Sequence, residues 1–197
     1  MKPFLKALSL LLLGLLIGLS ALAESKATMP THSEKATLAA GCFWGVEEFF
    51  RKVPGVYETG VGYSGGTKVK PTYNEVSSGT TGHAESVEIL FDSKKVSYEK
   101  LLDLFFKMHD PTTLNAQGND RGTQYRSALF YHSEAQKKVA ESFKARVEKS
   151  KAWKSKIVTE IVSAGPFYEA EEEHQKYLLR NPNGYDNHYL RKISFDP

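Results

Sequence analysis

The sequence has a single cysteine, Cys42, among its 197 residues. One thiol cannot form an internal disulfide, although disulfides are common in exported chains. The six histidines show no H-x-x-x-H spacing of the kind that binds zinc, so we expect no metal site. Internal repeats and an interdomain linker are also lacking, and the length suits one domain with a sizeable core.

The sequence also lacks a strong charge imbalance. The formal net charge is +3 at pH 7, from 26 basic and 23 acidic residues. A surface that binds nucleic acid normally needs a clear excess of basic side chains. The composition therefore argues against a nucleic-acid-binding protein.

The only long apolar run lies at the N-terminus. Lys2 and Lys6 precede this run, which ends in the small-x-small pattern of residues 21–23. The arrangement predicts a signal peptide over residues 1–23 that is cleaved after Ala23, with a retained membrane anchor as the alternative. Cleavage would lower the formal charge to +1. The sequence has no cysteine near the cleavage point for lipid attachment, and we expect an exported protein.

The rest of the sequence interleaves strand and helix patterns after a polar leader, expected to be disordered, over residues 24–34. Expected strands cover residues 35–40, 56–63, 85–91, 124–131 and 157–163. Expected helices cover residues 43–53, 97–108, 134–149 and 169–180, and long polar loops cover residues 64–78 and 109–121. Such alternation within one domain, residues 35–197, predicts an α+β or α/β fold.

Cys42 lies where a strand is expected to give way to a helix, in Gly41-Cys42-Phe43-Trp44-Gly45. The free amide groups and the positive dipole end at the start of a helix favour the thiolate over the thiol. The aromatic neighbours can form the walls of an apolar pocket beside the sulfur. A reactive cysteine is our main interpretation, and a small buried apolar residue is the alternative.

Two other motifs do not have the context that they need. Residues 60–65 read G-V-G-Y-S-G, which satisfies the dinucleotide-binding string, but a polar stretch with a proline follows in place of a helix. We therefore expect a turn there. His83-Ala84-Glu85 resembles half of a zinc deaminase motif, but the sequence has no P-C-x-x-C partner for it.

A papain-like cysteine hydrolase remains an alternative. Trp44 follows Cys42 closely, and His174 and Asn187 lie 132 and 145 residues after Cys42. These separations are typical of that family, but the local C-G-[SA]-C-[WY] string is missing.

Four further segments are rich in polar and aromatic residues: 71–73, 82–85, 118–125 and 173–177. Together with G-C-F-W-G they closely resemble the peptide methionine sulfoxide reductase A family, and the resemblance extends from Ala36 to about Tyr185. It implies a ferredoxin-like α/β sandwich of the α+β class, with long coil segments, as the catalytic domain over residues 35–197. It also implies reduction of the S epimer of methionine sulfoxide, free or in proteins.

The chemistry of that reaction gives roles to four residues. A sulfoxide is reduced when a nucleophile attacks its sulfur and an acid protonates its oxygen. We assign the attack to the Cys42 thiolate, because the thiol is far less reactive. Glu85 is the acid, since a carboxyl among aromatic side chains loses solvation and its pKa rises. Tyr73 and Tyr125 donate hydrogen bonds to the oxygen, as in an oxyanion hole.

Five more residues are expected to shape the substrate pocket. Phe43 and Trp44 hold the S-methyl group of the substrate through sulfur–aromatic contacts. The resemblance places Asp120, His174 and Tyr177 at the border of the same pocket, and His174 and Tyr177 would share one face of the expected helix. An alternative is a secreted module that binds oxidised methionine without turnover. Such a module needs neither an acid nor a thiolate.

The product of the attack is a sulfenic acid on Cys42. Members of the family often carry a resolving cysteine after N-P-N-G-Y, but this sequence has Asp186 there. An external thiol must then reduce Cys42: a thioredoxin-like protein, a glutaredoxin or a small thiol. We expect a monomer without a bound cofactor that repairs oxidised methionine in the periplasm or outside the cell.

Overall fold

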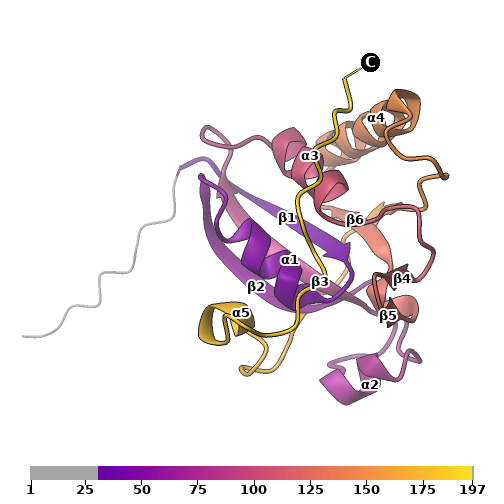
Figure 1. Cartoon of the computed structure of the whole chain (residues 1–197). Helices are drawn as coiled ribbons and strands as arrows, with labels where there is room; N and C mark the ends of the chain where they lie inside the picture. The colour runs from indigo at the N-terminus through magenta and orange to yellow at the C-terminus, as the bar shows by residue number, and fades with distance from the viewer. Residues whose placement is uncertain (1–30, 197) are drawn as a thin grey trace, which may run out of the picture.

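The structure, a computed structural model, describes residues 31–196 (Figure 1). The predicted signal peptide and residues 24–30 of the predicted leader lie outside the described residues. The strands are β1 (Ser33–Ala40), β2 (Val56–Ser64), β3 (Ala84–Asp92), β4 (Ala116–Gln117), β5 (Asp120–Arg121), β6 (Ser127–Tyr131), β7 (Glu160–Ser163) and β8 (Tyr168–Glu169). The helices are α1 (Phe43–Phe50), α2 (Tyr73–Ser77), α3 (Tyr98–Met108), α4 (Glu134–Ser150) and α5 (Tyr177–Arg180). Within residues 31–196, no helix is long and apolar enough to cross a membrane.

A six-stranded sheet forms the centre of the fold, in the order β7-β6-β1-β3-β2-β8. β1 and β2 both pair antiparallel with β3, which lies between them. They are therefore parallel to each other, and α1 makes the crossover of a split βαβ unit. β6 pairs antiparallel with the other edge of β1. The four central strands thus have the ferredoxin-like order, and the predicted α+β class is confirmed.

One face of the sheet carries the hydrophobic core. Ala36 and Leu38 on β1 and Val87 and Ile89 on β3 are fully buried, and they alternate with residues on the opposite face. α1 and α3 cover the core face, and α4 packs beside α3 (Figure 1). The same face carries Glu85 near the beginning of β3, so the core positions one of the predicted reacting residues.

The helix expected over residues 169–180 is wrong except for its last turn. Glu169 pairs with Gly62 as part of β8, residues 172–176 form turns, and only α5 is helical. Lys176 has a left-handed backbone with φ of 52°, and both its N–H and its ammonium donate to the buried carboxylate of Glu47. Hydrogen bonds to distant parts of the chain replace those of a local helix.

Smaller differences occur at other boundaries. β1 begins at Ser33, inside the expected leader. The expected loop over residues 64–78 contains α2, which starts with a capping box at Thr72. The expected loop over residues 109–121 contains the short β4–β5 pair. The expected strand over residues 124–131 begins late, because a 3-10 turn precedes β6.

Candidate active site

Cys42 lies between the end of β1 and the start of α1, as the sequence predicts. Gly41 makes this turn with φ of 96°, and a Cβ there would lie 2.6 Å from the Cβ of Gln117. Only glycine fits such a position without strain. Cys42 occupies the N-cap of α1 and is 7% exposed. A substrate must therefore fit between the side chains that surround the sulfur.

Glu85 lies next to the cysteine turn. It is 2% exposed, and its carboxyl Oε2 accepts a hydrogen bond at 3.0 Å from the backbone N–H of Phe43, which directly follows Cys42. Burial raises the pKa of Glu85 to about 8; the Phe43 N–H acts to lower it, and the negative charge of Asp120 acts to raise it. The carboxyl therefore holds a proton at neutral pH, as the sequence predicts.

Burial opposes the thiolate that the start of α1 favours at Cys42. Burial raises the pKa of Cys42 above its ordinary value, and the negative charges of Glu85, Asp120 and Asp186 raise it further. A hydrogen bond from the Trp44 N–H acts to lower the pKa, which is the effect expected at a helix start. The loss of solvation outweighs that single bond, so Cys42 rests as a thiol.

Two phenols lie within electrostatic reach of both groups. Tyr73 begins α2, and Tyr125 ends the 3-10 turn before β6. Burial, followed by the negative charge of Glu85, raises the pKa of each phenol, and the charge of Cys42 contributes to both. The phenols therefore remain protonated hydrogen-bond donors at physiological pH. The structure thus brings the four predicted reacting residues together.

Aromatic rings form one wall of the site. Trp44 stacks on Tyr177 with ring centroids 4.0 Å apart, and its Nε1 donates a hydrogen bond to His174 Nδ1 at 3.2 Å. The ring centroid of His174 lies 5.4 Å from that of Phe43 and 4.3 Å from that of Tyr73. The predicted aromatic residues are therefore neighbours. The predicted shared helix face is wrong, because His174 lies in the turn before α5.

Asp120 connects the site to the C-terminal coil. Its carboxylate accepts hydrogen bonds from Asn187 Nδ2 at 2.9 Å and from the Tyr185 hydroxyl at 3.1 Å. Asn187 Nδ2 also donates to the backbone oxygen of Gln117, whose side chain packs on Gly41. The predicted border residue Asp120 therefore holds the coil beside the cysteine turn.

His188 fastens the same coil to the end of β1, and the side chains of Asp186 and His188 pack against the first turn of α1. His188 Nε2 donates to the backbone oxygen of Ala40 at 2.7 Å, and Nδ1 lies 3.1 Å from Asp186 Oδ1. A Cβ on Gly45 would overlap both side chains. Sequence reasoning missed His188, because a single histidine in a coil has no spacing signal.

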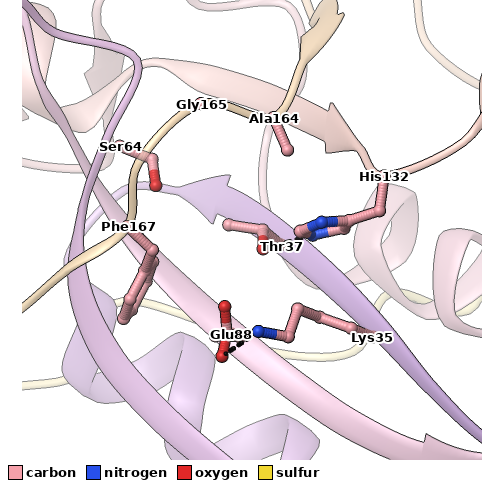
Figure 2. Close-up of a pocket in the computed structure, with 8 residues that line it drawn as sticks. All are labelled: Lys35, Thr37, Ser64, Glu88, His132, Ala164, Gly165 and Phe167. Carbon is pink, nitrogen blue, oxygen red and sulfur yellow. Dashed lines mark hydrogen bonds and ion pairs between the residues drawn. The ribbon is translucent and has the colours of Figure 1, made fainter.

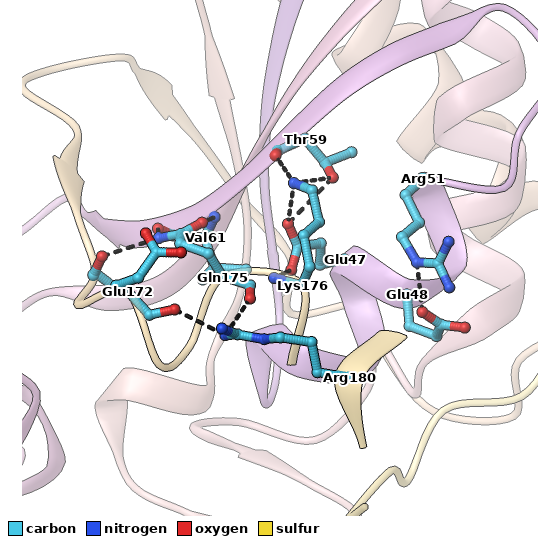
Figure 3. Close-up of polar contacts among 10 residues, drawn as sticks. Glu47, Glu48, Arg51, Thr59, Val61, Glu172, Gln175, Lys176 and Arg180 are labelled. Atoms are coloured by element: carbon cyan, nitrogen blue, oxygen red, sulfur yellow. Dashed lines mark hydrogen bonds and ion pairs between the residues drawn. The ribbon is translucent and has the colours of Figure 1, made fainter. Parts of the chain in front are cut away.

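A second group of polar contacts, shown in Figure 3, was also missed. The side chain of Glu47 is 1% exposed and pairs with Lys176 Nζ at 2.7 Å. Gln175 accepts from the Val61 N–H and donates to the Val61 oxygen, both at 2.9 Å. These bonds fasten the turn that carries His174 to β2. The sequence signal for this group was Glu47, a charged residue at a position that the apolar pattern of α1 assigns to the buried face.

The contacts do not support the papain-like alternative. His174 bonds to Trp44, whereas Asn187 bonds to Asp120 and Gln117. A papain-like site needs a third group that orients the histidine beside the cysteine. In the part of the chain that the structure describes, no hydrogen bond joins His174 to Asn187.

The two weak motifs have structural roles. The glycine string expected to form a turn at residues 60–65 lies mostly within β2, and the next helix, α2, begins only at Tyr73. His83 Nδ1 accepts from the Gly66 N–H, and its Nε2 donates to the oxygen of Lys68, which holds the loop after β2. Among the described residues, no group of three His, Cys, Asp or Glu side chains could hold a metal ion.

A separate cavity of about 390 Å³ lies on the opposite face of the sheet (Figure 2). Lys35 pairs with Glu88 across it at 2.8 Å, and Thr37 Oγ1 is hydrogen-bonded to His132 Nε2 at 2.9 Å. These polar groups already have partners, and Cys42 does not line the cavity. The candidate active site is therefore the cysteine turn.

These features define a class of protein. A buried thiol, a protonated buried carboxyl and two phenols converge at one end of a split βαβ sheet, beside an aromatic wall. The arrangement is that of a single-domain enzyme in which a cysteine attacks the substrate and a carboxylic acid supplies a proton.

Comparison with known proteins identifies the family. The profile of the family described as peptide methionine sulfoxide reductase matches residues 34–195. A relative from Methanothermobacter thermautotrophicus, named peptide methionine sulfoxide reductase MsrA, is 58% identical over 149 residues, which is 76% of this chain and 88% of that protein. This chain belongs to the peptide methionine sulfoxide reductase A family.

Solved structures agree with this assignment. The crystal structure of Mxr1 from Saccharomyces cerevisiae in reduced form superimposes with a TM-score of 0.78 at 42% identity, over 83% of this chain and 94% of that one. The structure of the same yeast protein in complex with Trx2 gives a TM-score of 0.56 at 31% identity, over 83% of this chain and 93% of that one.

Proposed function

We propose that this protein is a peptide-methionine (S)-S-oxide reductase in which Cys42 attacks the sulfoxide sulfur and Glu85 supplies the proton. The position of Glu85 carries the proposal: its buried carboxyl bonds to the N–H that follows Cys42, and burial raises its pKa to about 8. A carboxyl with that pKa holds a proton at neutral pH and can pass it to an oxygen on which negative charge develops.

The reaction transfers one oxygen atom and two electrons. The Cys42 thiol and the sulfoxide give the Cys42 sulfenic acid and the thioether, so no net proton is consumed. Sγ bonds to the substrate sulfur while Glu85 protonates the oxygen, and the S–O bond then breaks. The oxygen that leaves attacks Sγ, and the bond between Sγ and the substrate sulfur breaks, which returns an electron pair to the thioether and leaves the oxygen on Sγ. The thiol proton replaces the one that Glu85 releases. Burial is the main cause of the raised pKa of Cys42, and a charged Glu85 adds to it, so a protonated Glu85 removes one of the charges that oppose the thiolate.

The surrounding side chains bind the two ends of the sulfoxide group. Tyr73 and Tyr125 are protonated donors that stabilise charge on the oxygen. Phe43 and Trp44 lie in the aromatic wall and take the S-methyl group. Sulfur–aromatic contacts of this kind contribute about 1 kcal/mol.

An external thiol completes the cycle. The sequence has no second cysteine, so a thiol from another molecule attacks Sγ, releases water and forms a mixed disulfide that a further thiol opens. The solved complex of yeast Mxr1 with Trx2 supports a thioredoxin-like partner for this role.

We also place the mature protein in the periplasm or outside the cell. The N-terminal pattern of two lysines, an apolar run and a small-x-small site supports export and cleavage after Ala23. Mass measurement of the mature chain tests this. A chain that begins at Glu24 supports export with cleavage, whereas a chain that keeps residues 1–23 in the membrane fraction supports an anchor.

A single-turnover experiment tests the activity. The reduced protein is mixed with a peptide that contains methionine sulfoxide, without any added reductant. We expect one thioether per chain and one added oxygen atom on Cys42, and neither product with Cys42→Ser. Cleavage of the peptide would instead support the hydrolase, and binding without conversion would support the module.

A further inference from the structure

We infer that Glu171 is a positioning residue of this enzyme, which sets the Tyr73 phenol at a fixed place relative to Glu85. The inference rests on the proposed function, because it concerns the hydrogen bond from Tyr73 to the sulfoxide oxygen. Glu171 lies in the coil after β8, in the segment that the sequence wrongly predicts as a helix.

The carboxylate of Glu171 joins two tyrosines. Its Oε1 accepts from the backbone N–H of Tyr73 at 2.8 Å, and its Oε2 accepts from the hydroxyl of Tyr63 at 2.9 Å. Burial acts to raise the pKa of Glu171, but these hydrogen bonds outweigh it and lower the pKa, which keeps the carboxylate charged. Each oxygen therefore has its own donor.

Tyr63 connects Glu171 to the acid. It lies on β2 directly opposite Glu85 on β3, and side chains at opposed positions lie on the same face of a sheet. Tyr63 is fully buried, and its ring centroid lies 6.0 Å from that of Phe43. The ring is thus fixed beside the acid, and its hydroxyl fixes Glu171.

Tyr73, by contrast, lies on an element with little support of its own. α2 has five residues, and such a short helix is not stable alone. The N–H of Tyr73 is in the first turn and has no partner within the helix, so Glu171 supplies one. Glu171 also accepts the N–H of His174 on its backbone oxygen at 2.9 Å, and His174 packs on the Tyr73 ring.

These contacts form one path from Glu85 through Tyr63 and Glu171 to Tyr73. Tyr125 lies on the turn before β6, and within residues 31–196 no hydrogen bond links it to Glu171. A change at Glu171 should therefore act on the reaction through Tyr73 and not through Tyr125. A donor that is displaced from the reacting oxygen loses transition-state stabilisation.

The first test compares Glu171→Gln with Glu172→Gln. In Glu171→Gln an amide nitrogen replaces one carboxylate oxygen and cannot accept a hydrogen bond, so the variant loses one of the two tyrosine contacts. The side chain of Glu172 is exposed and bonds to neither tyrosine, so its substitution removes the same charge without that contact. In single-turnover reduction of the sulfoxide peptide we expect E171Q to be about tenfold slower, because small displacements of a reacting group cost up to ~10²-fold. E172Q should react at the wild-type rate.

Double variants identify the route of the effect. E171Q should slow the Tyr73→Phe variant no further, whereas it should slow the Tyr125→Phe variant by the same factor as the wild type. Reduction of the Cys42 sulfenic acid by thiol should be unchanged. An equal slowing in the Tyr73→Phe background, or a rate for E171Q equal to that of E172Q, would overturn the inference.

Tyr63→Phe carries the same test if E171Q does not fold. It removes only the hydroxyl contact with Glu171, so we expect a smaller slowing that again disappears in the Tyr73→Phe background. A Tyr63→Phe variant that reacts at the wild-type rate would contradict the inference. A wild-type protein that does not reduce the sulfoxide contradicts the proposed function, whereas an active wild type with a normal E171Q contradicts only the role of Glu171.

Discussion

At the scale of single residues, Cys42 and Glu85 have environments that favour their uncharged forms. Burial is the largest cause for both groups, and a charged Glu85 also opposes a charged Cys42. No basic side chain is among the groups that shift the pKa of either residue in the described part of the chain. Both groups therefore hold their protons in the free protein, and the proposed mechanism requires the thiol proton to leave Cys42 during the reaction.

The rate of sulfoxide reduction should consequently fall as pH rises through about 8. Glu85 is protonated below this pH and loses its proton above it, because burial raises its pKa to about 8. This pH dependence is tested by single-turnover rates measured from about pH 6 to about pH 10, a range of roughly two units on each side of the Glu85 pKa. Glu85→Gln should be slow throughout and should lack the fall. A fall at the same pH in Glu85→Gln would assign it to another group.

At the scale of elements, the sequence predicts those segments whose structure follows from a local pattern, and it fails for those whose structure depends on contacts with distant residues. α3 and α4 were predicted nearly to their ends, because both segments are amphipathic at helical spacing and Ser97 can cap α3; in the structure Ser133 caps α4 as well. The turn at residues 172–176 was not predictable in this way. Its conformation depends on Glu47 and Gln175, which bond to residues more than a hundred positions away.

The site divides in the same way. Cys42 and Glu85 lie in short strings whose chemistry is visible in the sequence, and the structure places both in the site. Glu171 and His188 were missed, because their roles come from partners that only the folded chain brings near. Glu171 also lies in a run of three glutamates, where nothing distinguishes it from its neighbours.

The buried pair of Glu47 and Lys176 gives a stability prediction. Lys176→Met should lower the free energy of unfolding by about 2–3 kcal/mol, because it leaves the buried Glu47 carboxylate without its cation. Lys176 is partly exposed, so the loss should be smaller than for a fully buried ion pair. Urea unfolding measures the change. Lys138→Met, at an exposed position on α4, is the control and should have little effect.

A double variant separates charge from packing in this pair. Glu47→Leu combined with Lys176→Met removes both charges and should recover part of the lost stability. If the double variant is as unstable as the sum of the single variants, the pair contributes through packing and not through an unpaired charge.

The glycine in the first turn of α1 gives a second prediction for this scale. Gly45→Ala should lower the melting temperature and the single-turnover rate together, because the added Cβ would overlap Asp186 and His188 and push the C-terminal coil off the cysteine turn. Overpacking of this kind costs about 1–3 kcal/mol. Gly165→Ala is the matched control, since a Cβ there would meet no atom within 4 Å. Equal behaviour of the two variants would show that the coil adapts.

At the scale of the whole molecule, the C-terminal coil brings Asp186 to the start of α1, beside the reacting thiol. Many relatives are expected to place a second thiol at this point in the chain, and this sequence places a carboxylate there. The C-terminal coil therefore still reaches Cys42, but it brings no thiol that could reduce the Cys42 sulfenic acid. Another molecule must supply that thiol. Turnover must then depend on collision with a reductant.

The steady-state rate should rise in proportion to reductant concentration until reduction of the sulfoxide becomes limiting. Without reductant, the protein should stop after one thioether per chain and hold a sulfenic acid that a sulfenic-acid-specific trapping reagent labels, because no second thiol can displace its oxygen. Asp186→Cys should instead give an internal disulfide with loss of water and no label, because position 186 adjoins the start of α1. A steady-state rate of the wild-type protein that does not change with reductant concentration, even when that concentration is low, would contradict this prediction.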